Sequence, residues 1–221
     1  MRHRIYHFFV IAVLAALPNN EGYCKQDISS SSPNRIQEVA GLIDKFRPKI
    51  IDGGFYADET QSAEPERELI EIASASPEAR TAVINALIDT LNEPGLRFNY
   101  DGYHSLSSGV CRVLGKLKAV ESIDVLVTHL SESSMFGGYS YTPFVWALVQ
   151  IGEPAVSKIQ ERLSSEGKCG RACRINAIQA LGEIRGDDMR EQFETRLLTE
   201  RDRYVRNVLM GYLNRWNLTL K

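Results

Sequence analysis

Apolar positions recur along the second half of the chain in a pattern typical of paired helices. Four leucines mark it at nearly even spacing: Leu114, Leu148, Leu181 and Leu213, separated by 34, 33 and 32 residues. Each lies in a short stretch with apolar residues three or four positions apart, and a second such stretch follows each of the first three. A period near 33 residues with two helices per unit predicts an all-α fold whose units stack as a solenoid.

Caps and breakers give the expected bounds of these helices. Ser76, Pro77 and Glu78 favour a helix start, with serine as the cap and proline at the first helical position. The pair Gly53 and Gly54, after Pro48, is expected to form a loop. We expect helices over 35–46, 65–74, 76–92, 105–116, 119–130, 142–151, 153–163, 172–184, 187–198 and 202–216, the last capping the stack with Trp216.

The N-terminal segment differs in character from the rest. Basic residues at positions 2 and 4 precede the apolar run 8–17, which is the layout of a secretory signal peptide and is too short to span a bilayer. Candidates for the residue before the cleavage point are Ala15, Ala16 and Gly22. We therefore expect residues 1–22 to be a signal peptide, 23–34 a flexible polar linker and 35–221 one helical domain in a periplasmic or extracellular protein.

Composition narrows the classes of partner. The formal net charge of −2 gives no basic field for nucleic acid, and no apolar run reaches the length of a membrane span. Cys24 suggests a lipid anchor, but Glu21 stands where a lipobox has an apolar residue and Tyr23 where it has a small one. We expect neither nucleic acid nor a membrane among the partners.

Four cysteines fit an oxidising compartment: Cys24, Cys111, Cys169 and Cys173. Cys169 and Cys173 are close enough in sequence to be a candidate disulfide, with a modest gain from so short a loop. Cys111 is expected to be a buried small side chain on an inner helix. Only His104 and His129 lie outside the signal peptide, so no zinc site is expected and no cofactor is implied.

Two phrases resemble HEAT-like repeats of the short type found in phycobilisome lyases. They are residues 147–156 (ALVQIGEPAV) and 180–185 (ALGEIR). In this family the phrase marks the end of a first helix, a tight turn and the start of a second; the valine–arginine pair of that family is matched by Val205 and Arg206, with Arg174 one unit earlier. The resemblance covers about residues 64–217. It implies an armadillo-like α-α superhelix of about four to five pairs, which generally serves as a binding scaffold.

The most unusual local feature is a pair of aromatic, glycine-bearing loops, each directly before the first helix of a unit. Tyrosine and phenylalanine on neighbouring loops supply rigid amphipathic contact area, and the next equivalent loop is basic. The alternative is that these loops pack on each other and cover helix ends. The candidate binding residues are Tyr100, Tyr103, His104, Phe136, Tyr139, Tyr141, Arg171 and Arg174.

Catalytic interpretations find little support in the sequence. It has no His-Glu pair, and no Gly-x-Ser-x-Gly, P-loop or His-Glu-x-x-His pattern. We expect a non-catalytic, exported scaffold that binds a protein. The alternatives are recognition of a small molecule or glycan through the tyrosine-rich loops, and, more weakly, a lyase-like enzyme.

Overall fold

The computed structural model describes residues 33–46, 49–51, 54–56, 59–93, 106–131, 142–165 and 167–219. The chain divides into two units, Met1–Ser30 and Ser31–Lys221, and the described residues belong to the second. Apart from one short hairpin this described part is all-α, as predicted. The expected signal peptide and most of the expected linker lie outside it.

The first helix, α2 (Pro33–Asp44), begins two residues before the expected domain boundary, with a proline at its first position. Its core face consists of Val39, Leu42 and Ile43, and Phe46 just beyond the helix is also buried. Ile36, which the periodicity assigns to the same face, is 56% exposed. The helix therefore contacts the core only through its second half and the turn that follows.

A two-stranded antiparallel hairpin follows where the sequence analysis placed a loop. Strands β1 (Lys49–Ile51) and β2 (Gly54–Tyr56) pair with Ile50 opposite Phe55. Residues 52 and 53, between the strands, are Asp and Gly, a dipeptide that favours tight hairpin turns. The loop expectation was wrong because the glycines were taken only as helix breakers.

The next two helices form the first closely packed pair. Helix α3 (Glu59–Ala75) starts six residues before Pro65, so the expectation that this proline opens the helix was wrong. Helix α4 (Pro77–Leu91) starts as predicted: the Ser76 hydroxyl accepts a hydrogen bond from the amide of Ala79 at 3.1 Å. The two helices pack along each other.

Three further units and a final helix follow. Each second helix opens with a 3-10 turn, which the sequence analysis did not distinguish from the helix. The elements are α5 (Leu106–Lys116), the turn Val120–Ser122, α6 (Ile123–Thr128), the turn His129–Ser131, α7 (Pro143–Ile151), the turn Glu153–Ala155, α8 (Val156–Ser164), α9 (Arg171–Arg185), the turn Gly186–Met189, α10 (Arg190–Thr199) and α11 (Arg203–Thr219).

Two of the turns between helices depend on glycine. Gly152 follows α7 with φ +82°, and Gly186 follows α9 with φ +56°, the region that glycine adopts without steric cost. In both cases the glycine amide bonds a carbonyl of the last helical turn, that of Leu148 or Gly182. Gly152 ends its helix as the sequence predicts.

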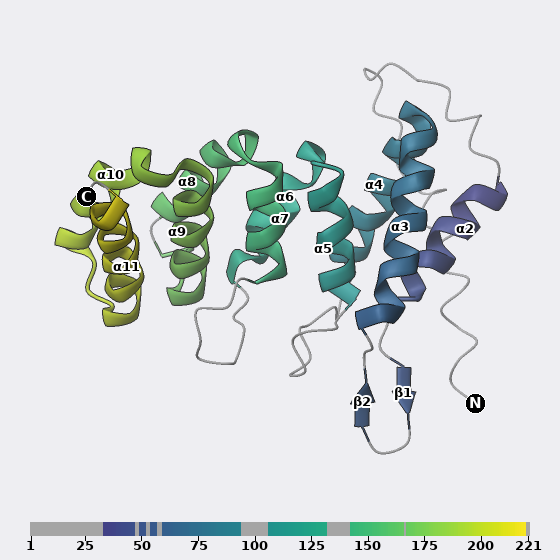
Figure 1. Ribbon diagram of the computed structural model, residues 1–221, viewed down its shortest axis with the longest axis horizontal. Coiled ribbons are helices and arrows are strands. Elements are labelled where there is room, and N and C mark those ends of the chain that lie inside the picture. The colour runs from purple at the N-terminus through teal and green to yellow at the C-terminus, as the bar shows by residue number, and fades with distance from the viewer. Residues whose placement is uncertain are drawn as a thin grey trace. The chain divides into compact units, whose positions relative to one another are not determined.

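Packing between helices is serial along this part of the chain. First helices contact first helices, α3 to α5, α5 to α7, α7 to α9 and α9 to α11, and these four later helices lie side by side in Figure 1. Second helices α6 and α8 contact each other, and each of α4, α6, α8 and α10 also packs on the first helix that follows it. Each helix therefore contacts mainly its near neighbours in sequence.

The repeated leucines lie in one continuous core. Leu114, Leu148 and Leu181 are at most 1% exposed, and Leu213 is 8% exposed. Cys111 is buried among them, as expected. At the end of the core, the Trp216 ring lies 5.4 Å from that of Phe193, centroid to centroid, so α11 covers α10 as the sequence predicts.

Candidate functional site

The structure describes two of the eight predicted binding residues. Arg171 and Arg174 lie in the first turn of α9, at the end of the segment that the sequence analysis identified as basic. The other six are outside the described residues: Tyr100, Tyr103, His104, Phe136, Tyr139 and Tyr141. The site that can be built is therefore the basic part, where the start of α9 meets the start of α11.

Arg171 is an exposed residue that joins these two helices. Its Nε lies 2.6 Å from an Asp202 carboxylate oxygen, and its guanidinium carbon lies 4.8 Å from the centroid of the Tyr204 ring. The other Asp202 oxygen accepts a hydrogen bond from the amide of Tyr204 at 2.9 Å, so Asp202 also caps α11. The pKa of the Asp202 carboxyl is lowered, and the hydrogen bond from Arg171 is the largest cause of this shift.

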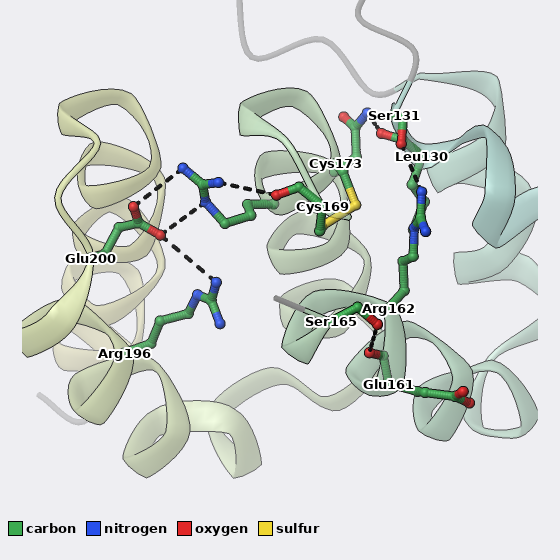
Figure 2. The surroundings of a disulfide bond; sticks show 11 residues. Leu130, Ser131, Glu161, Arg162, Ser165, Cys169, Cys173, Arg196 and Glu200 are labelled. Carbon is green, nitrogen blue, oxygen red and sulfur yellow. Dashed lines mark hydrogen bonds and ion pairs between the residues drawn. A yellow bond between two sulfur atoms is a disulfide. The ribbon is translucent and has the colours of Figure 1, made fainter. Parts of the chain in front are cut away.

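The Arg174 side chain is only partly exposed, because its guanidinium contacts other groups of the protein. Its guanidinium contacts two residues that Figure 2 labels, Cys169 and Glu200. Its Nη1 donates to the Cys169 oxygen at 3.1 Å and its Nε lies 3.0 Å from Glu200, whose side chain is only 8% exposed. Arg196 contacts the same carboxylate at 3.8 Å, and its partial burial lowers the pKa of that guanidinium. Arg174 therefore joins the start of α9 to the turn before α11.

Arg206 is the fourth residue of α11, as Arg174 is of α9. It donates to the backbone carbonyls of Leu197 and Glu200, just as Arg174 donates to that of Cys169. In both units an arginine in the first turn of a first helix thus satisfies carbonyls of the segment before it. The two arginines thus have the same kind of contact, although the carbonyls lie five residues before Arg174 and six and nine residues before Arg206.

The pair Cys169 and Cys173 is joined in a disulfide at the start of α9 (Figure 2). Cys173 is fully buried and Cys169 is 6% exposed. The bond fixes the segment whose carbonyl Arg174 contacts. It therefore positions the arginine that holds Glu200.

Two residues of this region were missed by the sequence analysis. The Tyr204 ring is 44% exposed, and Arg203 lies 4.7 Å from its centroid and donates to its hydroxyl at 2.8 Å. That hydrogen bond, helped by the positive charges of both arginines, lowers the pKa of Tyr204. The sequence did contain a signal for these two residues. When Arg174 is aligned with Arg206, residues 201–204 become the equivalent, one unit later, of the end of the predicted basic loop.

We define the basic rim as Lys168, Arg171, Arg201, Arg203 and Tyr204. All five side chains are exposed. The neighbouring carboxylates that the structure describes are largely buried: the side chains of Asp202 and Glu200 are 15% and 8% exposed. The surface that the rim offers to solvent is therefore cationic and aromatic.

Charge is unevenly divided between first and second helices. The segments 106–118, 142–152, 167–185 and 201–219 contain eleven lysines and arginines and two acidic residues. The segments 77–93, 119–131, 153–165 and 186–200 contain twelve acidic residues and five basic ones. Taken together, the first helices from α5 onward are thus basic and the second helices acidic, whereas the first helix α3 (Glu59–Ala75) is itself acidic, with five glutamates and one arginine.

Outside the basic rim, the described residues include one histidine, His129, which contacts two neighbouring helices. His129 stacks on Phe144 with ring centroids 4.9 Å apart, and its Nε2 lies 3.1 Å from the Leu91 carbonyl at the end of α4. It therefore serves as a capping and packing residue. Within the described ranges, no group of three or more His, Cys, Asp or Glu side chains is arranged to hold a metal ion.

Comparison of the chain with family models, with curated proteins and with solved structures found no match. The resemblance to HEAT-like repeats therefore rests on the residues quoted for it. Among the described helices, none combines the length and apolar composition that crossing a membrane requires.

Proposed function

We propose that this chain is an exported, non-catalytic module that binds another protein, built as a HEAT-like α-solenoid of four to five helical pairs in a right-handed superhelix. The observation that carries the proposal is the serial packing of the pairs. Units that bury their apolar faces on neighbours leave extended polar faces for a partner. The equivalent roles of Arg174 and Arg206, one repeat apart, support the repeat assignment.

Export is part of the same proposal. Residues 1–22 have the layout of a signal peptide, and the disulfide between Cys169 and Cys173 is typical of proteins in oxidising compartments. We propose a periplasmic or extracellular location. Expression of the full chain in a secreting host should release a product whose mass corresponds to cleavage near Ala15, Ala16 or Gly22. A full-length product retained in the cytoplasm would contradict export.

The binding function is tested by capture and reconstitution. The mature chain and a Tyr100→Ala/Tyr139→Ala/Tyr141→Ala variant serve as baits for the exported fraction, and any retained protein is purified and titrated against both baits. Equal, saturable binding to both baits supports a scaffold that uses its helical faces. Binding lost only with a variant whose circular dichroism is unchanged moves the site to the aromatic loops.

The alternative ligands give a different outcome in that experiment. If no protein binds but a glycan or small molecule binds to the parent chain and not to the triple variant, recognition through the tyrosine-rich loops replaces the scaffold proposal. Turnover of a bilin-bearing protein would instead support the lyase-like alternative.

A further inference from the structure

The cations of the basic rim are exposed while the nearest carboxylates are occupied. One Asp202 oxygen accepts from Arg171 and the other from the amides of Tyr204 and Val205. Glu200 is held by Arg174 and accepts from the amide of Asp202 at 3.0 Å. Asp202 and Glu200 stabilise the turn before α11 through these bonds and are themselves largely buried. They therefore neutralise the charges of the exposed rim only in part.

The rim retains donors for an external anion. A guanidinium has five N–H donors, and one donor of Arg171 serves the bond to Asp202. Among the described residues, no carboxylate forms an ion pair with Lys168 or Arg201. Arg171 and Arg203 both stack on Tyr204, which holds two guanidiniums beside one partly exposed ring. Arginine and tyrosine are, with tryptophan, the residue types enriched in protein-binding hot spots.

We propose that the basic rim binds an acidic segment of a partner protein, its carboxylates paired with Arg171, Arg201 and Arg203 and its backbone or apolar groups against Tyr204. The proposal rests on the proposed binding function and names the surface and the partner's chemistry. Planar guanidiniums recognise carboxylates through paired hydrogen bonds, and exposed pairs of this kind give modest but specific affinity.

A short acidic segment fits this surface better than a long polyanion. The rim occupies one end of two helices, whereas the second helices, with their excess of seven negative charges, carry the opposite sign. A nucleic acid, an acidic polysaccharide or an anionic membrane that extended from the rim along the first helices would meet cations that are already paired with carboxylates: Arg112 and Lys116 with Glu66, Arg185 with Glu153, and Arg215 with Glu183. A short acidic segment needs only the exposed cations of the rim.

The test compares two arginines of α11 that lie over tyrosine rings at opposite ends of the helix; Arg215 also pairs with Glu183 at 2.7 Å, so circular dichroism must show that its variants remain folded. Arg203 lies 4.7 Å from the Tyr204 ring centroid at the start of the helix, and Arg215 lies 4.7 Å from the Tyr212 ring centroid near its end. Variants Arg203→Gln and Arg215→Gln therefore remove the same charge, from the same helix, above the same kind of ring. Arg203→Glu and Arg215→Glu reverse both charges in the same way.

The probe is a fluorescent Glu/Ser peptide, measured by anisotropy against the mature chain at low and moderate salt, with a Gln/Ser peptide as the neutral comparison. We expect the Glu/Ser peptide to bind, Arg203→Gln to weaken it about threefold and Arg203→Glu about tenfold, with the Arg215 variants within about 1.5-fold of the parent. Equal losses for the Arg203 and Arg215 variants, or no difference between the peptides, would overturn the proposal.

Heparin and vesicles containing phosphatidylserine serve as competing probes. If either binds with a requirement for Arg203 and the Glu/Ser peptide does not, the partner is not an acidic protein segment and the proposal fails. The same variants are then applied to any partner found by capture. A captured protein that binds the parent and Arg203→Glu equally preserves the proposed function and overturns only the assignment to the rim.

Discussion

Close approach between helices explains three glycines of the described part. A Cβ atom on Gly109, Gly115 or Gly182 would lie 2.5 to 2.6 Å from an aromatic ring, that of Phe46, Trp146 or Tyr212 respectively. Gly115 and Gly182 both follow a repeated leucine, so they occupy the same place in two units. At these positions a large aromatic side chain, from a neighbouring helix or, for Phe46, from the turn after α2, fills the space a Cβ would need.

The substitution Gly182→Ala should lower the free energy of unfolding by about 1–3 kcal/mol, because the buried Tyr212 ring must shift away from its bonds to Gln179 and Glu183. The matched control is Gly211→Ala on α11, where a Cβ would meet nothing within 4 Å. That change should stabilise by about 0.5–1 kcal/mol through helix propensity. Urea unfolding measures both, and equal effects would contradict the role of close approach.

At the scale of elements, the start of α11 is fixed from α9 rather than by its own sequence alone. Asp202 caps α11 and also bonds Arg171, while Glu200 bonds Arg174. The disulfide at Cys169 and Cys173 holds the segment from which Arg174 reaches Glu200. The turn between α10 and α11 therefore depends on groups about thirty residues earlier in the chain.

Asp202 should stabilise this turn at neutral pH and lose that effect in acid. Its pKa in the folded state is lowered from the ordinary 3.8, chiefly by the hydrogen bond from Arg171. A lowered folded-state pKa gives stability that is present above pH 3.8 and is lost as the pH falls through the lower value. The melting temperature of Asp202→Asn should therefore lie below that of the parent at neutral pH and converge with it in acid.

Differential scanning calorimetry across the acid range checks this prediction. Asp188→Asn is the control: it removes the same charge before α10, where the described residues offer no ion-pair partner within 4.0 Å. A constant difference for Asp202→Asn at all pH values would mean that the loss of the cap, not of the charge pair, explains the effect.

The disulfide should be inert while the protein is folded, because its sulfurs belong to residues that are at most 6% exposed. Dithiothreitol followed by iodoacetamide should label Cys169 and Cys173 only in denaturant, as read by peptide mass spectrometry. The Cys169→Ala/Cys173→Ala variant should lose about 2 kcal/mol, the chain-entropy estimate for so short a loop. Labelling in buffer as fast as in denaturant would show that the pair opens locally.

Each helix of the described part packs mainly on its near neighbours in sequence, so a destabilising substitution should affect mainly the helices close to it. Trp216 packs on Phe193 and Tyr212 at the end of the core, so it stabilises α10 and α11 directly and α3 and α4 only through intermediate units. In a stack of repeats, stability is approximately a sum of unit and nearest-neighbour contributions.

The substitution Trp216→Ala should therefore increase amide hydrogen exchange in α10 and α11 strongly, in α9 less, and in α3 and α4 very little. A loss of about 3–5 kcal/mol is expected for the last unit. Trp146→Ala, in the middle of the series and packed on Gly115, is the comparison and should affect α5 and α7 most. Equal increases in every helix after Trp216→Ala would indicate a single cooperative unit.

The sequence by itself determined most of the helices, because their signals are local, but not the hairpin or the start of α3. The leucine period, the serine cap before Pro77 and the glycine after α7 fixed the helices and the buried positions that the structure has. The hairpin at β1 and β2 did have a local signal, Asp and Gly between two apolar strands, although the glycines were interpreted only as breakers.

The tertiary structure decided what the charged residues do, because that depends on groups far apart in sequence. Arg171 and Arg174 both fit the description of a basic loop, yet one is exposed beside Tyr204 and the other is bonded to a nearly buried Glu200. Glu66 lies in an acidic stretch that predicts a solvated helix face, but it is buried and bonded to Arg112 at 2.9 Å. Local periodicity specifies which face of a helix is apolar; it does not specify which charged group of the next unit comes within a few ångströms of it.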